Sequence, residues 1–439
     1  MKRINSVLML GLLLLAGCTT QPKTAALITA EKPIEIPIET QVTSISPTES
    51  KPKQALSTKC KLPNKKFGIY VTNHSQSYRK DKFAKIVKQT QSMGFNQIAV
   101  SVLYGGRSAV KTDSLVFPNH TFLEKEEGRD LFAEIQENSN LCAIAFAEWG
   151  TRYPFKSDLM LRYPEFFLAN NKGERFEHGD GVKFAFLNIL NENVKKSYLD
   201  YIRSLASNPN INVIQLDDHL AIGSSFGYNP EFIKGFNEFL VRNKIDFKGN
   251  KSKPDPKDLH WIKFRTQVVT NFFAQIVQAV NETNKEIEVT IVSGELRFMK
   301  DNYHQDFHQF TSKGAESIGV QAYGIPGKRN VASLLKREKN TTSIALFFAL
   351  GKEIVPQTVL KANMDAVIAN GNSEVWLFGH QPIYDGTEHS RAQQKFLKSL
   401  VVDYYAGHTA AAKTANNTKQ APVDHKSQPN QSVSSNNKK

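Results

Sequence analysis

The chain has 439 residues, of which 40% are hydrophobic and 22% charged, and its formal net charge at pH 7 is +14. This composition excludes a collagen-like, disulfide-dense or largely disordered protein. One apolar run is long, Val7 to Ala16, and it falls short of the ~20 residues that a membrane-spanning helix needs. A polytopic membrane protein is therefore excluded.

The positive charge gathers at the two ends of the sequence. Lysine and arginine outnumber the acids most strongly in residues 1–66 and 407–439, and the middle of the chain holds only a small excess. No basic stripe or nucleic-acid motif accompanies this charge, so we expect no nucleic-acid partner. Basic ends suit attraction toward an anionic cell-wall polymer or lipid surface.

The amino terminus has the pattern of an export signal. Lys2 and Arg3 precede an apolar stretch, and the small residues that follow it suit cleavage by a signal peptidase. The run Leu-Ala-Gly-Cys that ends at Cys18 resembles a bacterial lipobox. This resemblance implies that residues 1–17 are a lipoprotein signal peptide and that Cys18 is acylated, for example with palmitate.

Thr19, and not an aspartate, follows the cysteine. By resemblance to bacterial lipoprotein sorting, this residue favours the outer membrane, with the protein facing the periplasm. Several acyl chains on Cys18 would hold the protein stably at a lipid bilayer. The alternative is an ordinary secretory signal with an incidental cysteine.

Two further segments lack the apolar pattern of a core. Residues 18–64 are rich in Thr, Ser, Pro, Lys and Glu and predict a flexible tether, and residues 406–439 predict a disordered tail. Cys60 and Cys142 would meet an oxidising compartment, so a disulfide between them and two free cysteines both stay open. We expect no metal site, because no further Cys or His stands at ligand spacing.

Between these segments, residues 65–405 alternate short apolar runs with segments that have helical apolar spacing. Buried strands that alternate with helices form a parallel sheet, and eight such units predict an α/β fold of the (β/α)8 TIM-like barrel type. An open doubly wound sheet is the alternative, but it would carry a Gly-rich phosphate loop that we do not find. The expected strands are Phe67 to Asn73, Gln97 to Tyr104, Leu141 to Glu148, Val213 to Asp217, Glu288 to Ser293, Ser317 to Tyr323, Ser343 to Leu350 and Glu374 to Phe378.

In such a barrel the active site forms at the carboxyl ends of the strands. Polar and aromatic residues collect after these ends in the sequence, and the opposite ends look poor in such groups. Carboxylates beside Trp and Tyr suit a sugar, because rings stack on its C–H surface while carboxylates and amides bind its hydroxyls. The candidate substrate-binding residues are Asn73, Tyr104, Arg107, Trp149, His219, Glu295, Gln321 and Tyr323.

Glycoside hydrolysis needs one carboxyl group to protonate the leaving oxygen and a second to stabilise or attack the sugar or to activate water. Alternation along the fourth strand puts Asp217 on the inward face with Gln215 and puts Asp218 at the rim. Asp217 is then the candidate nucleophile or stabiliser, and Asp218 or Glu148 is the candidate proton donor. Each aspartate could instead cap a helix or anchor a loop, and Glu148 could pair with Arg152.

Several short runs in this sequence resemble the glycosyl hydrolase-like 10 family, a group of exported bacterial (β/α)8 proteins. The resemblance extends from Lys66 to Tyr405, and its most specific block is Gln-Leu-Asp-Asp-His, ending at His219. It implies an outer-membrane lipoprotein that cleaves peptidoglycan glycan strands stripped of their peptides, with Asp217 and Asp218 as the active-site carboxylates. The resembling runs are Phe67 to Asn73, Ala145 to Glu148, Val213 to His219 and Phe226 to Tyr228.

We therefore expect a lipid-anchored glycoside hydrolase that acts on cell-envelope glycan, in particular on peptidoglycan strands, without a cofactor or metal ion. A catalytically silent glycan-binding envelope lipoprotein is the first alternative, and a purely structural envelope protein is the second. The separation of the carboxylates discriminates between the hydrolase and the silent glycan-binding protein, because catalytic pairs lie within about 10 Å of each other.

Overall fold

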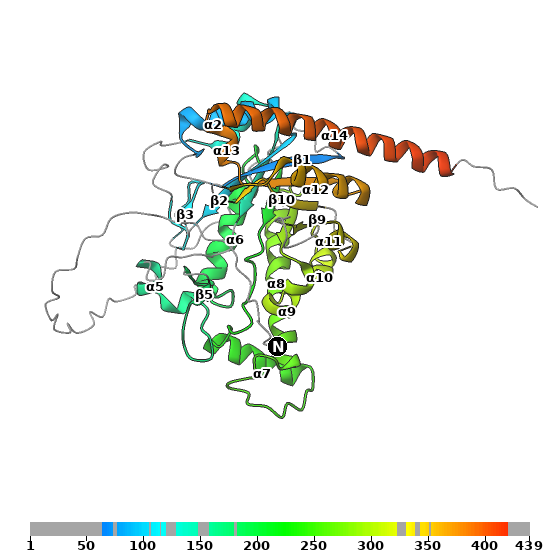
Figure 1. Ribbon diagram of the computed structural model, residues 1–439. Helices are drawn as coiled ribbons and strands as arrows, with labels where there is room; N and C mark the ends of the chain where they lie inside the picture. Colours follow the sequence, from blue (N-terminus) through cyan, green and yellow to red (C-terminus); the bar gives the residue numbers. More distant parts are fainter. Residues whose placement is uncertain are drawn as a thin grey trace, which may run out of the picture.

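The computed structural model describes residues 64–72, 77–104, 107–114, 116–119, 129–147, 158–179, 182–322, 331–338, 343–350 and 353–419. Eight parallel strands form a sheet in the order β1-β13-β10-β9-β8-β7-β4-β2, and pairing of β1 with β2 closes it into a barrel. Figure 1 shows the helices around this barrel. The eight strands are β1 (Lys66–Val71), β2 (Gln97–Tyr104), β4 (Cys142–Ala147), β7 (Val213–Leu216), β8 (Glu288–Ser293), β9 (Ser317–Gln321), β10 (Ser343–Phe347) and β13 (Glu374–Phe378).

The predicted TIM barrel is therefore confirmed, and each expected strand matches an observed one. The largest difference is in the seventh run, which was predicted as one strand up to Leu350. There the parallel strand β10 ends at Phe347, and the short strand β11 (Ala349–Leu350) pairs with β12 (Glu353–Ile354) instead. A second short hairpin joins β5 (Glu177–Gly179) and β6 (Val182–Phe184), and β3 (Arg107–Ser108) pairs antiparallel with β2.

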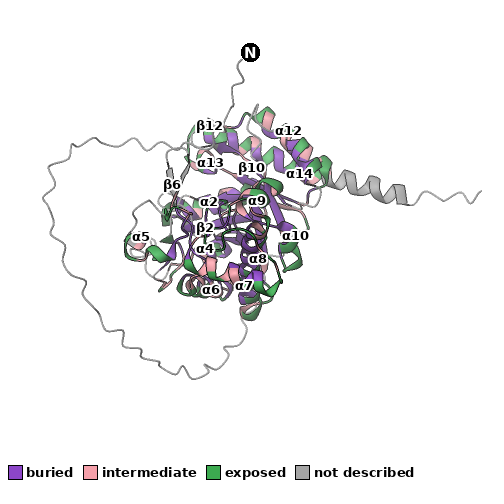
Figure 2. Cartoon of the chain, turned by 90° about the horizontal axis from the view of Figure 1, so that it is seen from below, coloured by how far each residue is buried: buried purple, intermediate pink, exposed green. Residues whose placement is uncertain are grey.

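The helices bury their apolar faces against the barrel and leave their polar faces to solvent, as Figure 2 shows. Several begin with a side chain that accepts hydrogen bonds from their first N–H groups, as Asp130, Asn191 and Asp258 do. The helices are α2 (Lys80–Ser92), α4 (Leu131–Asn138), α5 (Asp158–Arg162), the 3-10 helix η1 (Pro164–Phe166), α6 (Glu192–Ala206), α7 (Pro230–Arg242), α8 (Leu259–Thr283), α9 (Leu296–Tyr303), α10 (Phe307–Ser312), α11 (Val331–Arg337), α12 (Gln357–Asn370), α13 (Gln381–Tyr384) and α14 (Glu388–Lys419).

Aromatic side chains fill the interior of the barrel. The ring of Tyr70 lies 5.0 Å from that of Phe146, 4.9 Å from that of Trp376 and 5.5 Å from that of Phe378. Its hydroxyl donates a 2.6 Å hydrogen bond to Gln215, so the polar end of the ring is satisfied inside the barrel. The barrel is a packed core, and a ligand can reach the strand ends only from the mouth.

The floor of the barrel, at the amino ends of the strands, carries charged groups. Lys66 and Glu288 form a 3.1 Å ion pair. The buried Glu374 accepts hydrogen bonds from Trp376 and Ser317, and burial raises the pKa of its carboxyl group. The expectation that this end is poor in polar groups was wrong. Three strands begin with a charged residue, and their apolar centres drew attention away from these first positions.

The chain enters and leaves the barrel at this floor. Lys66 begins β1 there, and midway along α14 the ring of Tyr404 lies 5.3 Å from that of Phe67. Its hydroxyl also donates to the carbonyl of Asn372, just before β13. From this point α14 continues to Lys419 and extends past the body of the protein (Figure 1).

The predicted disordered tail over residues 406–439 was therefore wrong for residues 406–419, which are helical. Alanine at positions 406, 410, 411, 412 and 415 favours propagation of α14, and a low apolar content alone did not reveal this. Residues 420–439 lie outside the described part of the chain, as do residues 1–17 and the tether up to Pro63. None of the helices described is long and apolar enough to cross a membrane.

Cys142, the first residue of β4, is disulfide-bonded. The two other cysteines of the chain, Cys18 and Cys60, lie outside the described residues. A free Cys142, one of the two alternatives that the sequence left open, is thus excluded. The bond ties another part of the chain to the floor of the barrel.

Candidate active site

The site is built on the turn that follows β7. Val213 and Gln215 face the barrel interior, whereas Ile214 and Leu216 pack in the layer between strands and helices. Asp217 and Asp218 come directly after this strand. The side chain of Asp217 is 2% exposed and that of Asp218 is 24% exposed, so Asp218 is the aspartate that solvent and a ligand can reach.

His219 connects the two aspartates. Its Nδ1 contacts the carboxylate of Asp217 closely and lies 3.4 Å from Oδ1 of Asp218. Because an ionised carboxylate can only accept hydrogen bonds, Nδ1 must carry the hydrogen in the contact with Asp217. This arrangement fixes the imidazole orientation and shields Asp217.

The environment of Asp218 favours its protonated form. Burial is the main factor that raises the pKa of this carboxyl group, and the negative charge of Asp217 raises it further. His219 and a hydrogen bond from Gln321 act in the opposite direction and lower the pKa, but the net change is upward. Gln321 is the last residue of β9, so Asp218 extends toward the end of β9 at the mouth of the barrel.

Asp217, Asp218 and His219 could also hold a metal ion, since one ligand atom from each lies within 4.8 Å of the others. The donor set of two carboxylates and one imidazole is compatible with several divalent metals. The contacts of His219 Nδ1 with both aspartates already account for this cluster, and acidic groups commonly gather without a metal. Metal binding therefore forms no part of the function that we assign.

Arg265 of α8 holds the connection that follows this turn. The guanidinium is buried and donates to the carbonyls of Ser224 and Phe226 in the connection between β7 and α7, and to that of Pro256. Its side chain also lies over the ring of Trp261, at 5.1 Å from the ring centroid. Burial lowers the pKa of Arg265 to about 10, which leaves it charged at neutral pH.

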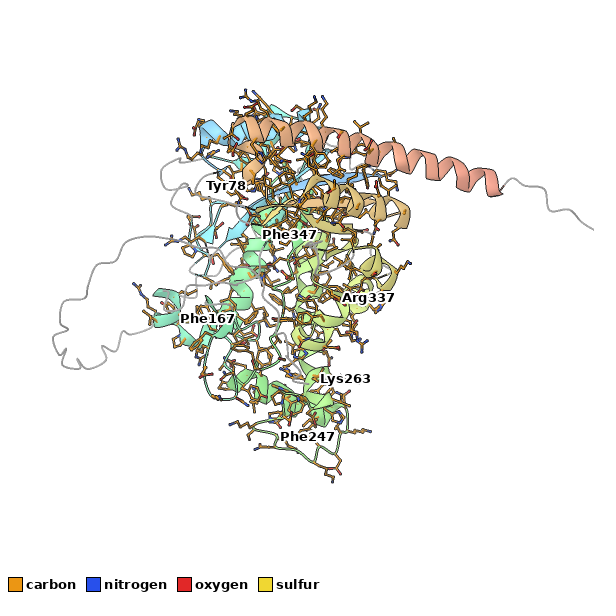
Figure 3. The ribbon with its side chains drawn as sticks, viewed as in Figure 1. Tyr78, Phe167, Phe247, Lys263, Arg337 and Phe347 are labelled. Atoms are coloured by element: carbon orange, nitrogen blue, oxygen red, sulfur yellow. The ribbon has the colours of Figure 1, made fainter. Side chains whose placement is uncertain are left out.

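The structure brings together three of the predicted site residues besides Asp217, namely Asp218, His219 and Gln321. Glu295 precedes α9 and instead pairs with Arg337 of α11 at 3.1 Å, the residue labelled in Figure 3. Arg107 is exposed on β3 and donates to the carbonyl of Asn119 in the same connection. Tyr104 ends β2, but its side chain lies outside the described part, as do Asn73, Glu148, Trp149, Tyr323 and Cys18.

Two pairs of residues near the mouth are not among the candidate site residues predicted above. Ser77 and His380 share a 2.7 Å hydrogen bond between Oγ and Nε2, which joins the start of α2 to the end of β13. The rings of Phe347 and Phe378 meet at 5.7 Å, and both are partly exposed. Inward alternation along β10 and β13 could have identified the phenylalanines, whereas Ser77 and His380 meet only in three dimensions.

A surface cavity of about 330 Å³ lies elsewhere, between η1 and the first turns of α6. None of the predicted site residues that the structure describes lines it. Its lining residues are Val116, Tyr163, Glu165, Phe166, Asn193, Lys196 and Ser197.

Solved structures with a similar fold include several sugar-cleaving enzymes. The glycoside hydrolase domain of PgaB (BpsB) from Bordetella bronchiseptica matches with a TM-score of 0.58 and 10% identity over 76% of this chain and 99% of that one. The catalytic domain of β-amylase from Paenibacillus polymyxa gives 0.53 and 12% over 76% and 98%. A β-galactosidase from Marinomonas ef1 gives 0.56 and 10% over 81% and 62%. At these identities the likeness shows a shared fold.

No curated protein matches the sequence significantly. The family comparison is more informative, because the model of the family described as glycosyl hydrolase-like 10 matches residues 66–345. This segment is more than half of the chain and contains the barrel from β1 to the middle of β10, including the turn with the two aspartates. The chain therefore belongs to the glycosyl hydrolase-like 10 family.

Proposed function

We propose that the protein is a lipid-anchored glycoside hydrolase that cleaves glycan strands of the cell envelope, with peptidoglycan as the substrate. The observation that carries the proposal is the state of Asp218. This carboxyl group is partly exposed at the mouth of the barrel, and its pKa is raised by burial and by Asp217. A carboxyl group whose pKa is raised keeps its proton to a higher pH than an ordinary aspartate and is better suited to protonate the leaving oxygen of a glycosidic bond.

Asp217 and Asp218 each present an oxygen atom, and these two oxygens lie within 4.8 Å of each other. Glycosidases use pairs of carboxyl groups that stand roughly 5–5.5 Å apart in retaining enzymes and roughly 6.5–9.5 Å apart in inverting ones. The two aspartates are therefore close enough to act on one sugar bond. We assign proton donation to Asp218 and stabilisation of the positive sugar centre to Asp217, whose charge is held close by.

Glu148 is the other carboxylate that we assign to the reaction. It directly follows Ala147, the last residue of β4, and β4 is the neighbour of β7 in the barrel. The carboxyl ends of all strands meet at the mouth of such a barrel, which makes Glu148 a candidate for the second carboxylate by its place in the sequence. In this alternative assignment, Glu148 attacks or stabilises the anomeric carbon, and Asp218 remains the acid.

A sugar substrate suits the mouth of this barrel. Phe347, labelled in Figure 3, and Phe378 offer partly exposed rings from adjacent strands. Flat apolar faces of this kind pack against the C–H surface of a pyranose, while Gln321 and His219 can bind its hydroxyl or acetamido groups. The family and the sugar-cleaving structures of similar fold agree with this substrate class.

The envelope location is supported by the sequence of the two ends. The pattern that ends at Cys18 resembles a lipobox, and the basic ends suit an anionic wall polymer. Because β1 begins at the floor, a tether from the membrane would attach on the side of the barrel opposite Asp218. The mouth would then face the wall.

The proposal is tested with the detergent-solubilised full chain and two substrates, glycan strands that carry stem peptides and strands from which the peptides have been removed. We expect new reducing ends with the peptide-free strands, loss of this activity in Asp218→Asn, and full activity in Asp246→Asn, which changes an exposed acid paired with Lys248. Failure to release reducing ends from either substrate would exclude the hydrolase.

A silent glycan-binding lipoprotein is the second candidate, and the burial of Asp217 favours it. A side chain that is 2% exposed and occupied by His219 reaches an anomeric carbon only if the turn moves. This candidate predicts that the wild type binds peptide-free strands without cleaving them and that Asp218→Asn binds them equally well. Sedimentation of the protein with insoluble glycan measures the binding.

A further inference from the structure

We propose that Gln305 is a positioning residue for Asp218, the candidate acid, because its buried amide fixes the backbone of the turn that carries this aspartate. The inference rests on the proposed function for its catalytic meaning. Its structural basis is independent, since Gln305 lies in the connection between α9 and α10, far from Asp218 in sequence.

Every hydrogen-bonding group of the Gln305 amide that a neighbouring residue can reach is used. Nε2 donates to the carbonyl of Asp218 at 3.0 Å and to the carbonyl of Leu220 at 2.9 Å. Oε1 accepts a 2.8 Å hydrogen bond from the hydroxyl of Ser293, the last residue of β8. The side chain is 0% exposed, so water cannot replace these partners.

This pattern fixes which way the amide faces. The carbonyls of Asp218 and Leu220 can only accept, so they require the NH2 group of Gln305 on their side. The hydroxyl of Ser293 then donates to Oε1 on the other side, and flipping the amide would place oxygen against two carbonyl oxygens. The two carbonyls thus set the orientation of the amide, and the hydrogen bond from Ser293 connects the amide, and through it the turn after β7, to the end of β8.

The same connection holds the turn at a second point. The N–H of Ile222 donates to the carbonyl of Tyr303 at 3.2 Å, two residues before Gln305. Between these residues lies His304, which adopts a left-handed φ of 59°. The turn from Asp218 to Ile222 is therefore attached on one side to residues 303–305, and the exposed side of Asp218 faces the mouth.

The Gln305 amide does not contact the carboxyl group of Asp218, so its effect must pass through the backbone. If the turn loses its two hydrogen bonds, it can move outward and hydrate the carboxyl group. Burial is the main cause of the raised pKa of Asp218, so hydration lowers that pKa. Asp218 then loses its proton at a lower pH, and its carboxyl group also moves away from the position in which it would contact the substrate.

The experiment compares Gln305→Met with Gln309→Met in the full chain. Methionine is close to glutamine in length and lacks its donors. Gln309 is an exposed glutamine on α10 whose side chain donates to Asp306. Carbon-13 NMR of labelled aspartate, with Asp218→Asn to assign the signal, measures the pKa of Asp218 directly. Reducing-end release gives kcat and KM.

For Gln305→Met we expect a fall in the pKa of Asp218 of about one unit or more, and a fall in kcat on the order of 10- to 100-fold with a smaller change in KM. Gln309→Met should match the wild type in both. A lower Tm of Gln305→Met with an unchanged pKa and unchanged kcat would show a purely structural role and overturn the proposal.

Ser293→Ala is the second variant, and it decides the matter if Gln305→Met does not fold. It removes only the hydroxyl that connects the amide to β8 and leaves the two hydrogen bonds to the turn in place, so we expect a shift of the Asp218 pKa in the same direction and of smaller size. An unchanged pKa in this folded variant would overturn the proposal. If the wild type cleaves no glycan, the proposed function fails while the NMR comparison still decides the role of Gln305.

Discussion

Gly68 of β1 lies directly against the indole ring of Trp376 on β13. A Cβ atom at Gly68 would stand 2.2–2.7 Å from three carbons of that ring, a separation that packed atoms cannot tolerate. We expect Gly68→Ala to destabilise the barrel by about 1–3 kcal/mol or more, because either the ring or the strand must shift. Denaturant unfolding of the two proteins measures the difference.

The matched control for this prediction is Gly173→Ala, since a Cβ atom there would meet no other atom within 4 Å, although its φ of +83° adds some strain. A second test reduces the size of the ring. Trp376→Phe in the Gly68→Ala background should recover part of the lost stability, and absence of any recovery would contradict the steric explanation.

The pH dependence of the reaction follows from the charges around Asp218. The acid is active while protonated, so the rate should fall as the pH rises through its raised pKa. The charge of Asp217 raises this pKa and His219 lowers it. Asp217→Asn should therefore move the falling limb to lower pH, and His219→Gln should move it to higher pH.

These two shifts are measured from kcat/KM against pH, or by NMR of Asp218 in variants with no activity. Asp246→Asn serves as the control and should leave the limb unchanged. Shifts of the same sign in both variants would contradict the electrostatic account, because the two neighbours act in opposite directions.

Two buried histidines predict a loss of stability in acid. Burial lowers the pKa of His380 to about 3 and that of His304 to about 2. The unfolded chain binds protons at both side chains below the ordinary value of about 6.5, and the folded chain does not. Each histidine should therefore remove up to about 1.4 kcal/mol of stability per pH unit as the pH falls below this value.

His304→Asn and His380→Gln should flatten this decline between pH 6.5 and pH 4. Asparagine is chosen for position 304 because it tolerates a left-handed backbone. Urea midpoints at several pH values give the slopes, and the exposed His308→Asn is the control. A slope that stays as steep in both variants would assign the acid sensitivity to other groups.

The disulfide of Cys142 predicts a defined covalent link. If Cys18 is acylated, Cys60 is the partner, and the link attaches the tether to the barrel floor six residues before β1 begins at Lys66. Peptide mapping without reduction should yield a peptide that joins Cys60 to Cys142. Recovery of Cys142 joined to Cys18 would disprove both this pairing and the acylation of Cys18.

The fold could be predicted from the sequence because each strand has a strong apolar run and the runs alternate with amphipathic segments. The site was harder to predict from the sequence, and Glu295 and Gln305 show why. Glu295 follows a strand end as expected, yet it pairs with Arg337 of α11, a contact that no local sequence pattern predicts. Gln305 belongs to no sequence motif. It reaches the turn after β7 only because the connection between α9 and α10 packs against that turn.

Asp217 and Asp218 illustrate the limit of strand alternation. The pattern separated a covered aspartate from an accessible one, because side chains alternate along β7 up to its last residue. Beyond Leu216 the chain turns, and alternation no longer determines where a side chain extends. The contact of Asp218 with Gln321 and the contact of Asp217 with His219 are both products of that turn.

Lys66, the first residue of β1, and Tyr404, midway along α14, lie beneath the barrel, on the side away from the aspartates. A label or a solid support attached to this side of the barrel would therefore leave the mouth open to a polymer as large as a wall fragment.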